Sequence, residues 1–210
     1  MTLEIWLAFV AATAALMAIP GPTTLLVLSY ALSQGRKVAV ATALGVALGD
    51  FAAMLATIVG LGAFILASAT LFSVIKWAGA AYLVYLGIGL IRSASGASLG
   101  TLPNAGAVTP GGVFRHAAAV TALNPKSIAF FIAFVPQFLR PDAAFVPQAT
   151  ILVVTFVTMG ALTALSYALL ADRLRVRIAR PRVLGWLTRF GGAALVAMGV
   201  ATASLKRAAG

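Results

Sequence analysis

The sequence predicts an all-α integral membrane protein with six transmembrane helices, arranged as two inverted three-helix repeats in which helices 1 and 4 are broken. The first observation is composition: 62% of the 210 residues are hydrophobic and only 9% are charged, whereas a soluble domain has about 25% charged residues. The second is a series of six long apolar runs. The third is a pair of proline motifs that interrupt the first and fourth runs. Residues 1–210 therefore form a single transmembrane domain.

Each apolar run is long enough to cross a bilayer, which takes about 20 residues. The predicted spans cover residues 4–32, 38–66, 71–91, 113–139, 147–170 and 183–205. The first, second and fourth runs exceed one crossing, so we expect these helices to tilt, bend or break. The link over 93–112 is rich in Gly, Ser, Ala and Pro and is typical of a flexible loop.

Basic residues lie mainly in the first, third and fifth links between these runs. Those links hold nine Lys and Arg residues, whereas the other side holds three. Because cytoplasmic loops carry the excess of Lys and Arg, this bias predicts that these links are cytoplasmic and that both termini are periplasmic. The net charge of +11 thus indicates membrane orientation, and we expect the partner to be the lipid bilayer and not a nucleic acid.

The first run is interrupted by Pro20, Gly21 and Pro22, which are followed by Thr23 and Thr24. Each proline lacks a backbone N–H and fixes φ, so an α-helix cannot pass through this triplet unbroken. Broken helix ends at bilayer depth are tolerated where they face protein or a polar cavity. Such breaks mark the binding sites of many transporters, although a proline kink without a ligand is the simpler alternative.

A similar break occurs in the fourth run. When Pro22 is aligned with Pro125, the matched pairs are Gly21 with Asn124, Thr23 with Lys126, Thr24 with Ser127, and Gln34 with Gln137. The two segments lie three spans apart and so cross the membrane in opposite directions. This arrangement predicts an inverted-topology repeat with a site between the halves.

Two charged residues lie far from the ends of the predicted spans. Asp50 follows the small-residue pair Gly45 and Gly49, which we expect to serve helix packing. A carboxylate within the membrane costs about 3 kcal/mol on insertion scales and marks a pathway by default; its alternative is a structural hydrogen bond to a neighbouring helix. Lys126 needs a partner, for which Asp50 is a candidate, unless its side chain snorkels to the surface.

Other residues give weaker signals. Tyr82 and Tyr85 could offer hydroxyls to a cavity or could pack, and His116 is expected at an interface. The chain has no cysteine, one histidine and four carboxylates, so we expect no metal site. No nucleophile or cofactor motif is visible, and we expect neither a cofactor nor an enzymatic activity.

The motifs Pro20-Gly21-Pro22, Gly49-Asp50 and Asn124-Pro125-Lys126, with 33–36 and 136–138, occur in the order typical of one family. In these motifs and in its overall size, the chain resembles the lysine-exporter (LysE/RhtB) family of amino-acid exporters. The resemblance implies a multi-pass protein of the bacterial inner membrane that exports amino acids by using the proton gradient. It does not imply which amino acid is exported.

These observations favour a secondary exporter of a small zwitterion. The half-helices that begin near Thr23 and at Lys126-Ser127 would present free N–H groups to a substrate carboxylate, because a helix N-terminus carries partial positive charge. Lys126 would add a full charge, and Asp50 would bind the substrate ammonium or the coupling proton. A homo-oligomer is compatible with this interpretation. The alternatives are an inorganic cation transporter that uses Asp50, or a membrane scaffold without transport.

Overall fold

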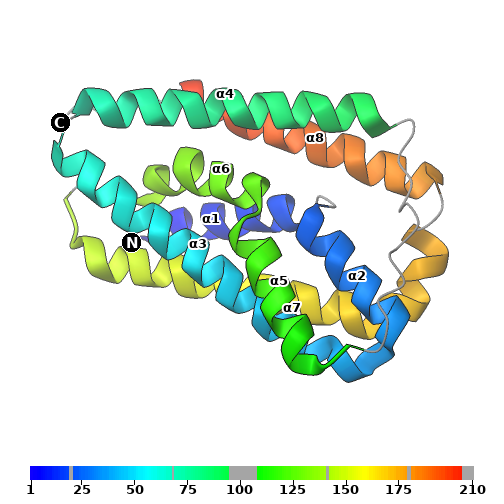
Figure 1. Ribbon diagram of the computed structural model, residues 1–210. Helices are drawn as coiled ribbons and strands as arrows, with labels where there is room; N and C mark the ends of the chain where they lie inside the picture. The colour runs from blue at the N-terminus through cyan, green and yellow to red at the C-terminus, as the bar shows by residue number, and fades with distance from the viewer. Residues whose placement is uncertain (19–20, 68, 95–107, 141, 179–180, 205–210) are drawn as a thin grey trace.

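The computed structural model describes residues 1–18, 21–67, 69–94, 108–140, 142–178 and 181–204. Within these ranges every regular element is helical. The α-helices are α1 (Leu3–Ala18), α2 (Pro22–Gln34), α3 (Ala39–Ala67), α4 (Ala69–Ser93), α5 (Pro110–Ala122), α6 (Pro125–Phe134), α7 (Phe145–Ile178) and α8 (Pro181–Ser204); η1 (Gly35–Val38) and η3 (Val135–Phe138) are short 3-10 helices. The helices lie alongside one another in one bundle (Figure 1).

The two breaks occur where the sequence predicts them. Helix α1 ends at Ala18 and α2 begins at Pro22, with a bend of 60°, and α5 and α6 meet at a bend of 45°. Among the described residues, two continuous helices are long and apolar enough to cross a membrane, and the two bent pairs bring the total to four. The six spans and the inverted repeat stay predictions.

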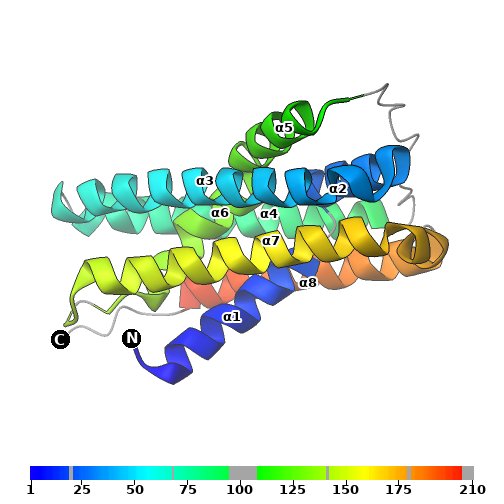
Figure 2. The ribbon, with the colours of Figure 1, turned by 90° about the horizontal axis from the view of Figure 1, so that it is seen from below.

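The breaks lie near the middle of the bundle. Helices α1 and α6 occupy one half of its length, and α2 and α5 occupy the other half, so the broken ends meet between them (Figure 1). The long helices α3, α4, α7 and α8 run along both halves, while the beginning of α1 splays away from them (Figure 2). This arrangement places four helix ends in the interior.

Glycines allow the closest helix contacts. A Cβ atom on Gly45 would lie 2.4 Å from the backbone oxygen of Phe114, and one on Gly49 would lie 2.6 Å from that of Ala118. Helix α3 therefore packs directly against the backbone of α5, as small residues at a membrane helix interface permit. In the same way, a Cβ on Gly87 would lie 2.5 Å from the backbone oxygen of Gly192, and one on Gly192 would lie 2.5 Å from that of Gly87. The backbones of α4 and α8 therefore contact each other closely at these glycines.

The apolar core is divided. One cluster surrounds Phe9, Phe130 and Phe156, in which the rings of Phe130 and Phe156 lie 6.0 Å apart. A second cluster joins α2, α3, α5 and α7 around Val27 and Val46. The polar residues around Asp50 and Asn124 lie between the two clusters, at the level of the breaks.

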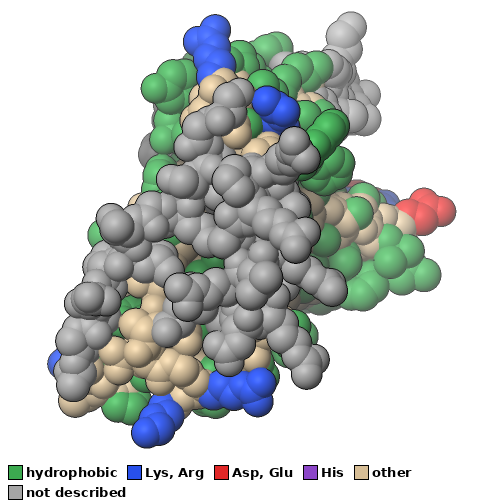
Figure 3. All heavy atoms as spheres, turned by 90° about the vertical axis from the view of Figure 1, so that its right-hand side faces the viewer, with side chains coloured by type: hydrophobic (Ala, Val, Ile, Leu, Met, Phe, Trp, Pro, Cys, Tyr) green, Lys and Arg blue, Asp and Glu red, His purple; other side chains and the backbone are tan. Residues whose placement is uncertain are grey.

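Basic side chains gather at one end of the bundle. At this end α4 ends and α5 begins, and Figure 3 shows Lys and Arg side chains around its rim. Arg36, Lys37, Arg92 and Arg115 are exposed. The structure thus brings the described basic residues of the first and third links to the same end of the bundle. The five arginines of the fifth link lie within 173–182, and their side chains are outside the described residues.

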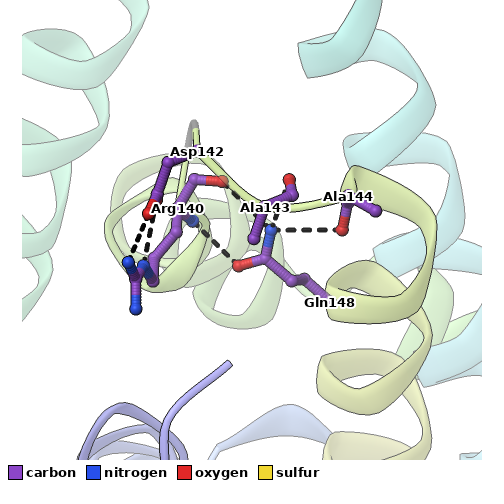
Figure 4. Close-up of polar contacts among 5 residues, drawn as sticks. All are labelled: Arg140, Asp142, Ala143, Ala144 and Gln148. Carbon is purple, nitrogen blue, oxygen red and sulfur yellow. Dashed lines mark hydrogen bonds and ion pairs between the residues drawn. The ribbon is translucent and has the colours of Figure 1, made fainter.

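The turn before α7 has its own polar network (Figure 4). The side-chain oxygen of Gln148 accepts a hydrogen bond from the backbone N–H of Arg140 (2.9 Å). Its side-chain nitrogen donates to the backbone oxygen of Arg140 (3.0 Å) and also lies within hydrogen-bond distance of the backbone oxygens of Ala143 and Ala144. Arg140 also forms an ion pair with Asp142. Because Gln148 is buried, these bonds satisfy the polar atoms of its side-chain amide and hold the turn to the start of α7.

Candidate functional site

The first half of the site is the start of α2. Gly21 is the N-cap and Pro22 is the first helical residue, so the first free N–H groups belong to Thr23 and Thr24. The backbone N–H of Leu25 already donates to the oxygen of Gly21 (2.9 Å). Within the described part of the chain, no residue accepts a hydrogen bond from the N–H groups of Thr23 and Thr24. A helix N-terminus of this kind attracts anionic groups.

The second half is the start of α6, which has the same organisation. Asn124 is the N-cap, and its side-chain oxygen accepts a hydrogen bond from the backbone N–H of Lys126 (3.1 Å). Pro125 occupies the first helical position, where its missing N–H is not needed. Ser127 follows and is buried. The predicted match between Pro22 and Pro125 is thus a match between two helix starts.

Hydrogen bonds join the two helix starts. The Asn124 side-chain nitrogen donates to the hydroxyl of Thr23 (3.1 Å), and this hydroxyl also lies within hydrogen-bond distance of the hydroxyl of Thr121 (3.3 Å). Asn124 and Thr121 are buried. The breaks are therefore held against each other by polar side chains within an otherwise apolar bundle.

Lys126 extends from α6 to the end of α1. Its ammonium group donates a hydrogen bond to the backbone oxygen of Leu16 (3.1 Å). This oxygen is one that Pro20 leaves free, because residue i+4 of a helix supplies the donor and proline has no N–H. A Cβ on Gly21 would lie 3.2 Å from the Lys126 nitrogen, so glycine leaves room for the side chain.

Asp50 lies in the middle of α3, where only 5% of its surface is exposed. Its carboxylate faces α7, and a Cβ on Gly160 would lie only 2.4 Å from its Oδ2 atom. The described residues contain no ion pair within 4.0 Å between Asp50 and Lys126, although the two charges attract each other electrostatically. Asp50, the candidate partner of Lys126, thus shares one cavity with it without a direct ion pair.

One cavity of about 50 Å³ connects these groups. It is large enough for about three or four water molecules. Of the predicted site residues, six line it: Thr23, Thr24, Asp50, Asn124, Lys126 and Ser127. Gly21 touches the Lys126 side chain, Pro22 and Pro125 begin the two helices, and Pro20 lies outside the described residues.

The cavity has a wall that the sequence analysis missed. Gly160, Thr163 and Tyr167 of α7 line it, together with Met17 of α1. The hydroxyl of Thr163 lies 3.6 Å from the sulfur of Met17. Their spacing of three and four residues places Gly160, Thr163 and Tyr167 on one helix face. Their regular spacing within an apolar run is the sequence feature that could have identified this wall.

Three other candidates lie away from the cavity. The rings of Tyr82 and Tyr85 stack on each other with centroids 6.1 Å apart, and both residues are exposed. His116 is exposed, and its Nδ1 atom lies 2.7 Å from the hydroxyl of Tyr30; its position at a membrane interface stays a prediction. The described residues contain no cluster of three or more side chains suited to a metal ion.

The sequence profile of one family, the LysE type translocators, matches residues 13–205. This chain belongs to that family. The resemblance inferred from the proline and Asn-Pro-Lys motifs is therefore confirmed. A LysE type translocator is a membrane transport protein and not an enzyme.

Two of the LysE type relatives align over almost the whole chain, and a third aligns over about three quarters of it. The chain is 34% identical over 208 residues to a homoserine/homoserine lactone efflux protein of Salmonella typhimurium, which covers 99% of this chain and 100% of the relative. It is 31% identical over 206 residues to an uncharacterized membrane protein of Vibrio cholerae, with 98% and 100% covered. A leucine efflux protein of Salmonella typhimurium is 30% identical over 153 residues, which is 73% of this chain and 72% of the relative. No solved structure matches the chain significantly.

Proposed function

We propose that this protein exports an amino acid or an amino-acid derivative across the bacterial inner membrane and that it uses the proton gradient. The observation that carries the proposal is the meeting of two helix N-termini in a cavity that also holds Asp50 and Lys126. Family membership and the efflux functions named for two relatives support it.

The cavity carries complementary groups for a zwitterion. The N–H groups of Thr23 and Thr24, with the start of α6 at Ser127, suit the substrate carboxylate. Lys126 adds positive charge to this end of the cavity. Asp50 binds the substrate ammonium or the coupling proton, and alternation between these two roles would couple export to the gradient.

The small volume of the cavity supports transport by alternating access. A space of about 50 Å³ holds a few waters, and in this proposal the helices separate to admit the substrate. The proposed motion is that of two inverted halves, 1–93 and 110–204, each with one broken helix followed by two long helices. The glycine contacts between α4 and α8 and between α3 and α5 join the two halves, so the halves would shift against each other at these contacts.

The proposed orientation places the first, third and fifth links in the cytoplasm and both termini in the periplasm. The exposed basic residues at one end of the bundle support it. A reporter that is active only outside the cytoplasm, fused after Gly210, should be active, and one fused within 95–110 should be inactive. The reverse pattern would contradict the orientation.

Transport is tested with purified protein in proteoliposomes, by counterflow of a panel of neutral, acidic and basic amino acids, with and without an imposed proton gradient. We expect at least one amino acid to exchange and the Asp50→Asn variant to lose gradient-driven export while remaining folded. Exchange of inorganic cations alone would favour a cation transporter. No exchange of any solute by folded protein would favour a scaffold, and full activity of Asp50→Asn would remove this residue from the mechanism.

A further inference from the structure

The end of α1 is a place where a positive charge is expected. Leu16 lies in the last turn of α1, where backbone oxygens lack helical donors and carry the partial negative charge of the helix dipole. Prolines at positions 20 and 22 remove the N–H groups that would have served the oxygens of Leu16 and Ala18. The sequence therefore creates two acceptors at this end by removing two donors.

The structure shows a primary ammonium group at this place. The Lys126 nitrogen donates to the oxygen of Leu16 at 3.1 Å, and a Cβ on Gly21 would lie 3.2 Å from this nitrogen, so a side chain there would crowd it. Leu16 and Asp50 line the same cavity, so a cation here lies between a helix C-terminus and a carboxylate. Both groups favour a cation that can donate hydrogen bonds.

We propose that the end of α1 is a subsite for a primary ammonium group, which Lys126 fills in this structure and which the amino group of the substrate takes during export. Lys126 then acts as a tethered substitute for the substrate. When the substrate amino group binds at Leu16, the released Lys126 ammonium is free to pair with the substrate carboxylate at the starts of α2 and α6. The assignment to the substrate rests on the proposed export function; the ammonium subsite itself does not.

The subsite is tested by removing the tether and supplying a free amine. Lys126→Ala opens the space, and we expect ethylammonium chloride to raise its Tm in detergent by about 3 °C or more near saturation. Tetramethylammonium chloride, which cannot donate hydrogen bonds, should have no effect. The unmodified protein and Lys126→Met, whose side chain fills the space without a donor, should not respond to ethylammonium. Equal responses to both salts, or no response in Lys126→Ala, would overturn the proposal.

A second variant serves if Lys126→Ala does not fold. The chain has no cysteine, so Lys126→Cys introduces a single thiol. Aminoethyl methanethiosulfonate gives this thiol a side chain that ends in an ammonium group, and propyl methanethiosulfonate gives a neutral one of the same length. We expect only the aminoethyl group to return the Tm towards that of the unmodified protein; equal effects of the two reagents would contradict an ammonium subsite.

These outcomes separate the subsite from the exporter. An ethylammonium response in a protein that exchanges no amino acid would support the subsite and contradict export. Amino-acid exchange by a protein whose Lys126→Ala variant ignores ethylammonium would support export and contradict the subsite.

Discussion

The side chain of Asn124 donates a hydrogen bond to the hydroxyl of Thr23, 3.1 Å away, and thereby joins the start of α6 to the start of α2. The two residues are 101 positions apart in the chain. The same asparagine also caps its own helix by accepting from the backbone N–H of Lys126. One side chain thus sets both the beginning of α6 and its distance from the other broken helix.

These two roles of Asn124 can be separated by mutation. Asn124→Asp keeps a good N-cap but replaces the donor to Thr23 with a carboxylate oxygen, whereas Asn124→Ala loses both bonds. We expect Asn124→Ala to lower the unfolding free energy by about 1–3 kcal/mol, because a cap is lost and buried groups are left unpaired. Both variants should lose transport. Thr23→Ser should keep the bond and the activity, and an active Thr23→Val protein, which has no hydroxyl at this position, would show that the link between the helices is not needed.

The second prediction concerns the break between α1 and α2. The double variant Pro20→Ala and Pro22→Ala supplies N–H groups for the oxygens of Leu16 and Ala18, so the helix can continue. We expect export to fall at least tenfold while the protein still inserts and expresses, because Lys126 loses its acceptor and the start of α2 is no longer free. The measurement is counterflow per folded molecule.

Pro147→Ala is the matched control for this double variant. Pro147 lies in the first turn of α7, where its N–H would have no helical acceptor, so its replacement should leave export unchanged. Normal export by the double variant would reduce the break to a kink without a ligand.

The third prediction concerns Gly160, which faces the Asp50 carboxylate. A methyl group at Gly160 would lie 2.4 Å from Oδ2, so the carboxylate has to rotate or shift in Gly160→Ala. Because only the end of a side chain moves, we expect little loss of thermal stability but a large loss of gradient-driven export. Gly60→Ala on α3 is the control, since nothing lies within 4 Å of a Cβ at that position. Equal transport by the two variants would show that the position of the carboxylate is unimportant.

The fourth prediction concerns acid stability of the turn before α7. The hydrogen bond from Arg140 holds the pKa of the Asp142 carboxyl below its ordinary value. The contribution of this group to stability is therefore present above the pKa of the unfolded chain, about 3.9, and is lost as the pH falls through the lower folded value. Both side chains are exposed, so the effect is small.

Thermal unfolding of the Asp142→Asn variant between about pH 3 and pH 6 checks this prediction. The variant should have a slightly lower Tm than the parent near neutral pH and should converge with it in acid. A constant difference across the range would show that the ion pair does not contribute. Gln148→Ala should destabilise more, by about 1–3 kcal/mol at all pH values, because the turn loses every hydrogen bond of this buried side chain.

The sequence alone determined the class, the breaks and half of the site. The low charge content required a membrane solvent. The prolines at 20, 22 and 125 had to end helices, since proline removes a donor and clashes with the preceding turn, and α2 and α6 begin at two of them. A buried carboxylate and a buried ammonium were conspicuous because each is costly in a bilayer. These conclusions depend on local chemistry, which a single chain displays.

Only the tertiary structure decided which groups meet. Lys126 binds the backbone oxygen of Leu16, and a backbone acceptor leaves no mark in a sequence beyond the proline that freed it. Gly160 faces Asp50 because α3 and α7 pack together at that level, and many glycines in apolar runs serve packing alone. Contacts between residues more than a hundred positions apart depend on how helices cross, and helix crossing depends on the fit of whole surfaces, which residue spacing within one helix does not encode.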